Sequence, residues 1–240
     1  MDVKFSHIWN VSVEEALQLQ TTLSRLVDIQ TPLHLDNIHL IAAIDVAYNR
    51  ENTEMFGAVV LMQFPELKLL SNFVTRAPIV RPYLPGLLSF REIPAILPVL
   101  EKLSEPIDLF MCDAHGVAHP RGLGLASHLG VLFDKPSIGC AKKPLVGDFI
   151  MPGERKGSTS PIKLNDNLVG YVLRSRENVK PIYISPGHKL TPEDALRVVE
   201  RCIRSYRIPE PLRVAHQMAN RARRVMEGKV SGIRIETFEE

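Results

Sequence analysis

Three apolar runs in the first third of the chain have the length and the aliphatic content of β-strands. They read "LIAAIDVAY" at 40–48, "MFGAVVLMQF" at 55–64 and "LKLLSNFVT" at 67–75. Short turns containing Asn, Glu or Pro separate them, as is typical of consecutive strands. Because links this short leave no room for a crossover helix, the pattern predicts an antiparallel meander.

Helical spacing of apolar residues replaces the strand pattern in five other segments. Ser12 and Glu15 form a capping box ahead of the first helix, and Thr191 and Pro192 begin the fourth as its cap and first residue. The predicted helices are 12–27, the stretch that follows the turn at 81–86 and ends near 103, 123–133, 191–206 and 211–228.

Four further apolar runs read as strands that follow or separate these helices. They are "IDLFMC" at 107–112, "PSIGCAKK" at 136–143, "NLVGYVLRS" at 167–175 and "PIYISPG" at 181–187, whereas the polar stretch "MPGERKGSTSPIK" at 151–163 reads as a loop. Strands that alternate with helices join a sheet in parallel. The fold class predicted is therefore α/β: a mixed sheet, three antiparallel strands followed by parallel strands, flanked by helices.

Composition limits the organisation and the environment of the chain. With 240 residues, 45% of them hydrophobic, we expect one domain over 1–240. The formal net charge of +2 gives no global basic field, so any contact with nucleic acid must be local. The three cysteines form no CxxC pair, and there is no signal peptide and no run of membrane-spanning length. We expect a cytoplasmic, soluble protein without a membrane partner.

Two aspartates interrupt or end strands that are otherwise apolar. Asp45 lies within "AAIDVA" and Asp113 follows "DLFMC". If the first meander strand lies beside the first parallel strand, the two carboxylates are neighbours and repel, which a shared proton or a metal ion relieves. Glu92, on the intervening helix, is a candidate third acid, and such oxygen ligands suit Mg²⁺ or Mn²⁺. The alternative is structural: Asp45 accepts backbone hydrogen bonds and Asp113 caps the next helix.

The histidines allow weaker interpretations. His115 and His119 have H-x-x-x-H spacing, which suggests zinc, but Gly116 and Pro120 between and beside them favour a loop. Ser127 and His128 are adjacent on a helix, so they do not face each other as a catalytic pair. His216 lies among several arginines of the last helix, as a base, a ligand or part of a solvated basic face.

The stretch "RPYLPGLLSFREIPA" at 81–95 places one aromatic ring in a stiff turn. Pro82 and Pro85 restrict the backbone around Tyr83, and Gly86 permits a close approach or an unusual dihedral angle. The ordinary interpretation is a helix entry with Tyr83 packed against it. A second interpretation is a ring presented for stacking, with Glu92 just behind it.

Five segments are similar, in sequence and in order, to the motifs of the endonuclease V family. They are "AAIDVAY", "RPYLPGLLSFRE", "DAHGVAHPRGLGLASHLG", "IGCAKKPLVG" and "SPGHKLT", and the resemblance covers about residues 40–220. It implies a ribonuclease H-like fold and a Mg²⁺-dependent endonuclease that acts on damaged DNA containing deaminated adenine (inosine). Such an enzyme nicks the second phosphodiester bond 3′ to the lesion, leaves 5′-phosphate ends and serves DNA repair.

The resemblance also implies a role for individual residues. Asp45, Glu92 and Asp113 match the metal-binding acids, with Lys142 and His216 as further catalytic residues near the reacting phosphate. Tyr83 matches the wedge that fills the gap left by the displaced base. The positions that match the pocket for the flipped hypoxanthine are Gly86, Leu88, Gly116, Gly124, Leu145 and Ser185.

One departure from the family pattern concerns the pocket. Ala114 follows Asp113 where the family usually has glycine, so a methyl group can narrow the pocket or restrict a positive φ angle. The alternatives to a DNA enzyme are an endoribonuclease acting mainly on inosine in RNA, a catalytically silent nucleic-acid-binding protein and a zinc hydrolase. We expect a monomer.

Overall fold

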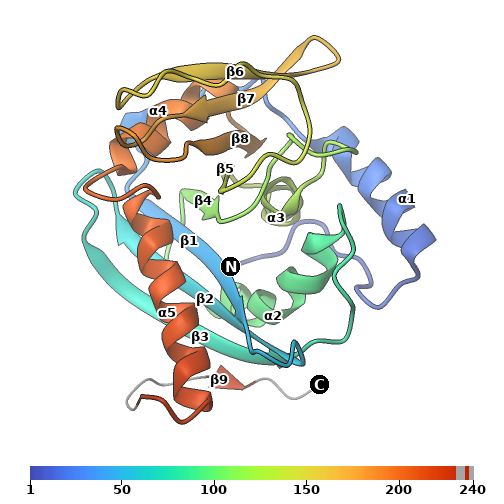
Figure 1. Ribbon diagram of the computed structural model, residues 1–240. Coiled ribbons are helices and arrows are strands. Elements are labelled where there is room, and N and C mark those ends of the chain that lie inside the picture. The colour runs from blue at the N-terminus through green and yellow to red at the C-terminus, as the bar shows by residue number, and fades with distance from the viewer. Residues whose placement is uncertain (231–235, 238–240) are drawn as a thin grey trace.

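The computed structural model describes residues 1–230 and 236–237, the last two by their backbone only. Nine strands form one mixed sheet in the order β6-β7-β8-β5-β4-β1-β2-β3-β9, with helices on both faces (Figure 1). The ribonuclease H-like mixed α/β class predicted from the sequence is confirmed, because the pairing pattern joins a meander to parallel strands.

The predicted meander forms three neighbouring strands on one side of the sheet. Strands β1 (Leu40–Tyr48), β2 (Glu54–Gln63) and β3 (Leu69–Pro78) pair antiparallel in chain order. On the other side of β1, the strands β4 (Leu109–Cys112) and β5 (Ser137–Ala141) are parallel to it, as their intervening helices require. The central strands are buried on both faces, which explains why they read as continuous apolar runs.

The other half of the sheet extends antiparallel from β5. Strand β8 (Ile182–His188) pairs with β5, and β7 (Asn167–Leu173) pairs with β8. The predicted loop at 151–163 was wrong at its end, because β6 (Thr159–Leu164) begins inside it. Alternate residues of β6 are buried, but Pro161 and the nearby Gly and Ser residues concealed this pattern. A proline is tolerated there because β6 is an edge strand.

Different pairs of helices cover the two faces of β1. Ile41 and Ala43 pack with α4 (Pro192–Cys202) and α5 (Glu210–Met226), whereas Ala42 and Ile44 pack with α2 (Leu88–Lys102) and α3 (Leu125–Phe133). Side chains alternate along a strand, so Asp45 follows Ala43 toward α5. The fold thereby directs an acid to the α5 face.

The N-terminal helix α1 (Val13–Leu23) lies against the α3 side of the molecule (Figure 1). Its predicted capping box is present, since the side chains of Ser12 and Glu15 bond reciprocally to each other's backbone amides. Two short 3-10 turns follow, Ser24–Leu26 and Leu35–Asn37. At the other end, β9 (Glu236–Thr237) pairs with β3, and the rest of the tail from 231 lies outside the described residues. None of the described helices is long and apolar enough to cross a membrane.

Candidate active site

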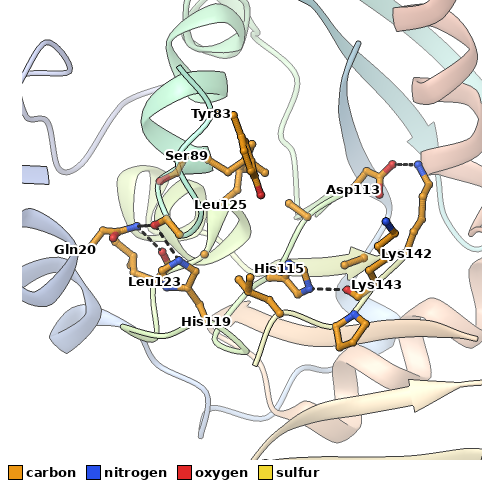
Figure 2. Close-up of a pocket in the computed structure, with 17 residues that line it drawn as sticks. Gln20, Tyr83, Ser89, Asp113, His115, His119, Leu123, Leu125, Lys142 and Lys143 are labelled. Atoms are coloured by element: carbon orange, nitrogen blue, oxygen red, sulfur yellow. Dashed lines mark hydrogen bonds and ion pairs between the residues drawn. The ribbon is translucent and has the colours of Figure 1, made fainter. Parts of the chain in front are cut away.

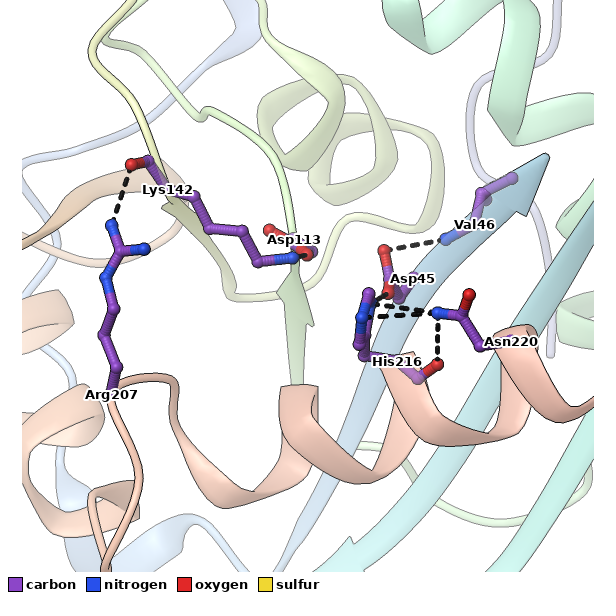
Figure 3. Close-up of polar contacts among 7 residues, drawn as sticks. All are labelled: Asp45, Val46, Asp113, Lys142, Arg207, His216 and Asn220. Atoms are coloured by element: carbon purple, nitrogen blue, oxygen red, sulfur yellow. Dashed lines mark hydrogen bonds and ion pairs between the residues drawn. The ribbon is translucent and has the colours of Figure 1, made fainter. Parts of the chain in front are cut away.

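Asp45 and His216 form the first part of the site. Asp45 Oδ2 lies 2.6 Å from His216 Nδ1 on α5, and Asp45 Oδ1 accepts the backbone N–H of Val46 at 2.9 Å (Figure 3). The contact with Asp45 raises the pKa of His216, more than its partial burial lowers it. The Asn220 side chain lies one helical turn further on and donates to the His216 carbonyl at 2.9 Å.

Asp113 and Lys142 form the second part, at the carboxyl ends of neighbouring parallel strands. Asp113 directly follows β4, and Lys142 follows β5 and donates to Asp113 Oδ2 (Figure 3). Burial, and then the charge of Asp45, raise the pKa of Asp113, against the opposing effect of Lys142. Asp113 does not cap α3, whose cap is Gly124, so the structural alternative for this residue was wrong.

The topology brings these acids together as predicted. Asp45, Asp113 and His216 each offer one ligand atom, and those three atoms all lie within 4.8 Å of one another. Two carboxylate oxygens and one imidazole nitrogen can hold a divalent cation. The donor set therefore fits a divalent metal, with a histidine where the third acid was expected.

Glu92 approaches the same region from the opposite face of the sheet, on α2. It is not part of the group formed by the two aspartates and His216. Its Oε1 accepts a hydrogen bond from the hydroxyl of Tyr48. Burial, followed by the charges of Asp45 and Asp113, raises the pKa of Glu92 to about 8. Glu92 is therefore close enough to interact electrostatically with Asp45 and Asp113. Its carboxylate is held by Tyr48, which was not among the predicted site residues.

A pocket of about 360 Å³ adjoins the acids and shares Asp113 and Lys142 with them (Figure 2). Tyr83 is 58% exposed at this pocket, so its ring does not pack down as a helix staple. Of the predicted base-pocket positions, the pocket is lined by Gly86, Leu88, Gly124 and Leu145.

Gly116 and Ser185 lie behind this pocket wall. The backbone N–H of Gly116 donates to Ser185 Oγ at 2.8 Å. A Cβ on Gly116 would lie 2.1 Å from the Pro186 carbonyl oxygen, and one on Gly124 would lie 2.3 Å from the His115 carbonyl oxygen. The two glycines thus let the loop after β4 pack tightly against β8 and against itself, which shapes the pocket.

Ala114 lines the pocket where the family usually has glycine. Its side chain is buried with the apolar residues of the α2 and α3 face. It is not among the described residues with positive φ, so the backbone strain expected there is absent. Its methyl group is therefore part of the pocket wall.

The alternative sites do not assemble among the described residues. His115 Nε2 lies 2.9 Å from the Lys143 carbonyl, and His119 Nε2 lies 3.0 Å from the Gly86 carbonyl, so these imidazoles point to different partners. His128 is buried, and its Nδ1 lies 3.0 Å from the Oγ of Ser89 rather than of Ser127.

Several residues that position the site were missed by sequence reasoning. The Gly86 carbonyl, in a residue with φ +80°, accepts hydrogen bonds from Gln20 and Arg121 at 2.8 and 2.9 Å, in addition to His119. Arg207 donates to the Lys142 carbonyl at 2.9 Å and fixes that end of the loop (Figure 3). These contacts join segments far apart in the chain, and no local motif marks them.

The acids lie toward the carboxyl ends of two adjacent central strands, β1 and β4, which is where open α/β sheets commonly bind their ligands. The sequence model of the family described as Endonuclease V matches residues 21–217. The chain belongs to the endonuclease V family.

The similarity to relatives and to solved structures extends along most of the chain. Endonuclease V of Xylella fastidiosa (strain 9a5c) is 45% identical over 214 residues, covering 89% of this chain and 90% of its own. The crystal structure of endonuclease V from Streptomyces avermitilis is similar with a TM-score of 0.84 and 36% identity, covering 96% of this chain and 100% of its own. A variant endonuclease V of Ciona intestinalis has a TM-score of 0.80 at 26% identity, covering 90% and 100%. It was solved in complex with a 23mer DNA containing an inosine followed by a ribo-adenosine.

Proposed function

We propose that this chain is a divalent-metal-dependent endonuclease that recognises inosine in damaged DNA for repair. It nicks the second phosphodiester bond 3′ to the lesion. The observation that carries the proposal is the pocket lined by Asp113 and Lys142, which adjoins the acid cluster of Asp45, Asp113 and His216, because a bound base would then lie beside the groups that act on the phosphate. The Ciona relative that holds inosine-containing DNA supports the choice of base.

Asp45 and Asp113 would hold the cation, with His216 beside them and Glu92 as a further ligand from α2. Mg²⁺, or Mn²⁺ in its place, supplies water activation and charge stabilisation of the leaving oxygen when bound. Hydrolysis adds water across the P–O bond, and the bond to the 3′ oxygen breaks. The products are a 3′-hydroxyl and a 5′-phosphate.

Two basic side chains, Lys142 and His216, act on the phosphate and on water. Lys142 offsets the charge that develops on the phosphoryl oxygens, since its ammonium lies at the mouth of the pocket. His216 donates from Nδ1 to Asp45, which leaves Nε2 to orient the attacking water or to accept its proton. Acceptance of a proton needs neutral imidazole, and Asp45 favours the charged form, so this step becomes faster as pH rises.

Base recognition uses the rigid turn and the loop after β4. The exposed ring of Tyr83 stacks in the space that the flipped base leaves. Backbone groups and side chains at Gly86, Leu88, Gly124 and Leu145 contact the base, and Gly116 with Ser185 supports the wall behind them. Stacking is worth about 1–3 kcal/mol per base, which offsets the few kcal/mol needed to extrude an already mispaired base.

Cleavage of a strand that carries a single inosine tests the proposal. We expect Mg²⁺-dependent nicking at the second phosphodiester 3′ to the inosine, loss of activity with chelator and recovery with Mg²⁺ or Mn²⁺. A matched strand with adenine is the control. Equal cleavage of both strands, or cleavage that persists in chelator, would contradict the proposal.

The second candidate is an inosine-specific endoribonuclease. The Ciona complex favours it, because its DNA carries a ribonucleotide directly after the inosine. Discrimination would rest on contacts to the 2′-hydroxyl. Matched DNA and RNA strands with one inosine decide between the candidates by their single-turnover rates. In both cases we propose that residues 1–240 act as one monomeric domain.

A further inference from the structure

Tyr48 lies at the end of β1, on the opposite face from Asp45. Val46 packs with the α2 and α3 face, and Tyr48 follows it in the alternation of the strand. From that face the Tyr48 hydroxyl reaches Glu92 Oε1 on α2. Burial raises the pKa of Tyr48, so the hydroxyl keeps its proton and is the donor in this contact.

Arg91, the residue before Glu92, fixes the Tyr48 ring from the other side. Its guanidinium carbon lies 4.5 Å from the centroid of the ring, and its Nη2 donates to Asn52 Oδ1 at 2.7 Å. Arg91 is only 4% exposed, and its Nε and Nη1 are buried without a hydrogen-bond partner. The ring face is therefore a principal contact of this buried cation, which holds the phenol in place.

We propose that Tyr48 is a positioning residue for Glu92, holding its carboxylate beside Asp45 and Asp113 in readiness for the cation. This inference rests on the proposed metal-dependent nuclease function. Residues that bond to metal ligands without touching the metal orient those ligands, and losing one costs about 10- to 100-fold in metal affinity or activity. Without this hydrogen bond, the Glu92 side chain would sample several rotamers. Its carboxylate would then be in position to bind the cation for a smaller fraction of the time.

A matched tyrosine–glutamate pair elsewhere in the chain separates positioning from packing. The hydroxyl of Tyr171 on β7 donates to Glu193 Oε1 on α4 at 3.1 Å, remote from the acid cluster. Tyr171→Phe removes the same kind of hydrogen bond without touching the site. It is the control for Tyr48→Phe, which keeps the ring beside Arg91 and removes only the hydroxyl.

The test measures Mn²⁺ binding to the full chain by electron paramagnetic resonance, without nucleic acid, and then single-turnover nicking of an inosine strand. For Tyr48→Phe we expect Mn²⁺ affinity to fall about 10- to 100-fold. Nicking at low Mg²⁺ should fall by a similar factor and recover in part at high Mg²⁺. Affinity for the inosine strand in chelator, and Mn²⁺ binding by Tyr171→Phe, should match wild type.

A double-mutant cycle tests whether Tyr48 acts through Glu92. If it does, Tyr48→Phe combined with Glu92→Gln binds Mn²⁺ no more weakly than Glu92→Gln alone. Additive losses, or wild-type affinity in Tyr48→Phe, would overturn the inference and leave Tyr48 a packing residue. The cycle uses differences in binding, so a lower melting temperature of either variant does not imitate the result. Failure of the proposed function is separate: wild type itself would then not nick inosine strands with Mg²⁺.

Discussion

His216 and His128 lie on helices that cover opposite faces of one sheet, and their surroundings favour opposite charge states. On the α5 face, His216 is partly exposed and contacts Asp45, which raises its pKa. On the α3 face, His128 is fully buried between Trp9 and Phe90, and burial lowers its pKa to about 3. The surroundings of His216 therefore accommodate charge and those of His128 exclude it, although both histidines stand in similar helical contexts in the sequence.

The hydrogen bonds around His128 have a fixed direction. His7 Nδ1 lies 2.9 Å from the Ile8 carbonyl, which can only accept, so His7 Nδ1 carries the hydrogen. His7 Nε2 then accepts from His128 Nε2 at 2.8 Å, and the Ser89 hydroxyl donates to His128 Nδ1. The partners of each histidine, and not its position on a helix, therefore decide whether it can act in catalysis or only stabilises the fold.

The largest expected effect removes charge from the α5 side. Asp113→Ala should lower single-turnover nicking of an inosine strand about a thousandfold or more, because a lost cation site removes several kcal/mol of transition-state stabilisation. Binding to that strand should persist, since removing an acid also removes repulsion from phosphate. Asp134→Ala is the control. Asp134 lies away from the site, and its Oδ2 pairs with Lys189 Nζ at a distance of 2.7 Å. Full activity in Asp113→Ala would end the metal-site assignment.

The next effect concerns Tyr83, the exposed aromatic residue that lines the pocket. Tyr83→Ala should bind an inosine duplex about ten- to a hundredfold more weakly, through the loss of about 1–3 kcal/mol of stacking. It should still nick at saturating protein and high Mg²⁺, because Tyr83 touches no ligand of the cation. Tyr206, exposed to a similar degree, gives the control Tyr206→Ala. Normal binding by Tyr83→Ala would show that the ring only supports the start of α2.

The two histidines should contribute to the free energy of unfolding with opposite dependence on pH. The pKa of His128 is lowered on folding, so its neutral form contributes stability above about pH 6.5 that is lost as pH falls toward 3, with a slope up to about 1.4 kcal/mol per pH unit. The pKa of His216 is raised, so its charged form contributes stability below about pH 6.5 that is lost as pH rises through the folded pKa.

Urea unfolding in chelator, from pH 4 to 8, measures both contributions. His128→Phe should flatten the rise in unfolding free energy between pH 4 and 6.5. His216→Gln should instead remove a decline above pH 6.5. Identical pH profiles for the two variants would mean that the faces do not differ in the way their contacts indicate.

The smallest effect tests the one departure from the family pattern. Ala114→Gly removes a single buried methyl from the pocket wall, worth about 0.8 kcal/mol or roughly fourfold. We expect it to alter relative nicking rates among inosine, uracil, abasic sites and mismatches more than the Mg²⁺ or pH dependence. Unchanged ratios across that set of lesions would show that the methyl group is silent.

The sequence predicted those parts of the fold and site that depend on periodicity and strand order. The meander and the capping box of α1 are local patterns, and the meeting of Asp45 with Asp113 followed from placing their strands side by side. Strand β6 was missed because Pro161 and small polar residues resemble a loop. The contact of Gln20 with Gly86 joins residues 66 apart, and no spacing rule reaches that far.

Lys142 and His216, which pair with the two aspartates, bear on how the protein folds in the absence of metal. Lys142 and His216 act as internal counterions, so the repulsion between Asp45 and Asp113 is offset within the polypeptide itself. In a zinc finger the metal affinity supplies the folding free energy, whereas we expect this chain to assemble its sheet without an external ion. Purification in chelator should therefore yield a folded protein, whose activity returns on simple addition of the ion without a refolding step.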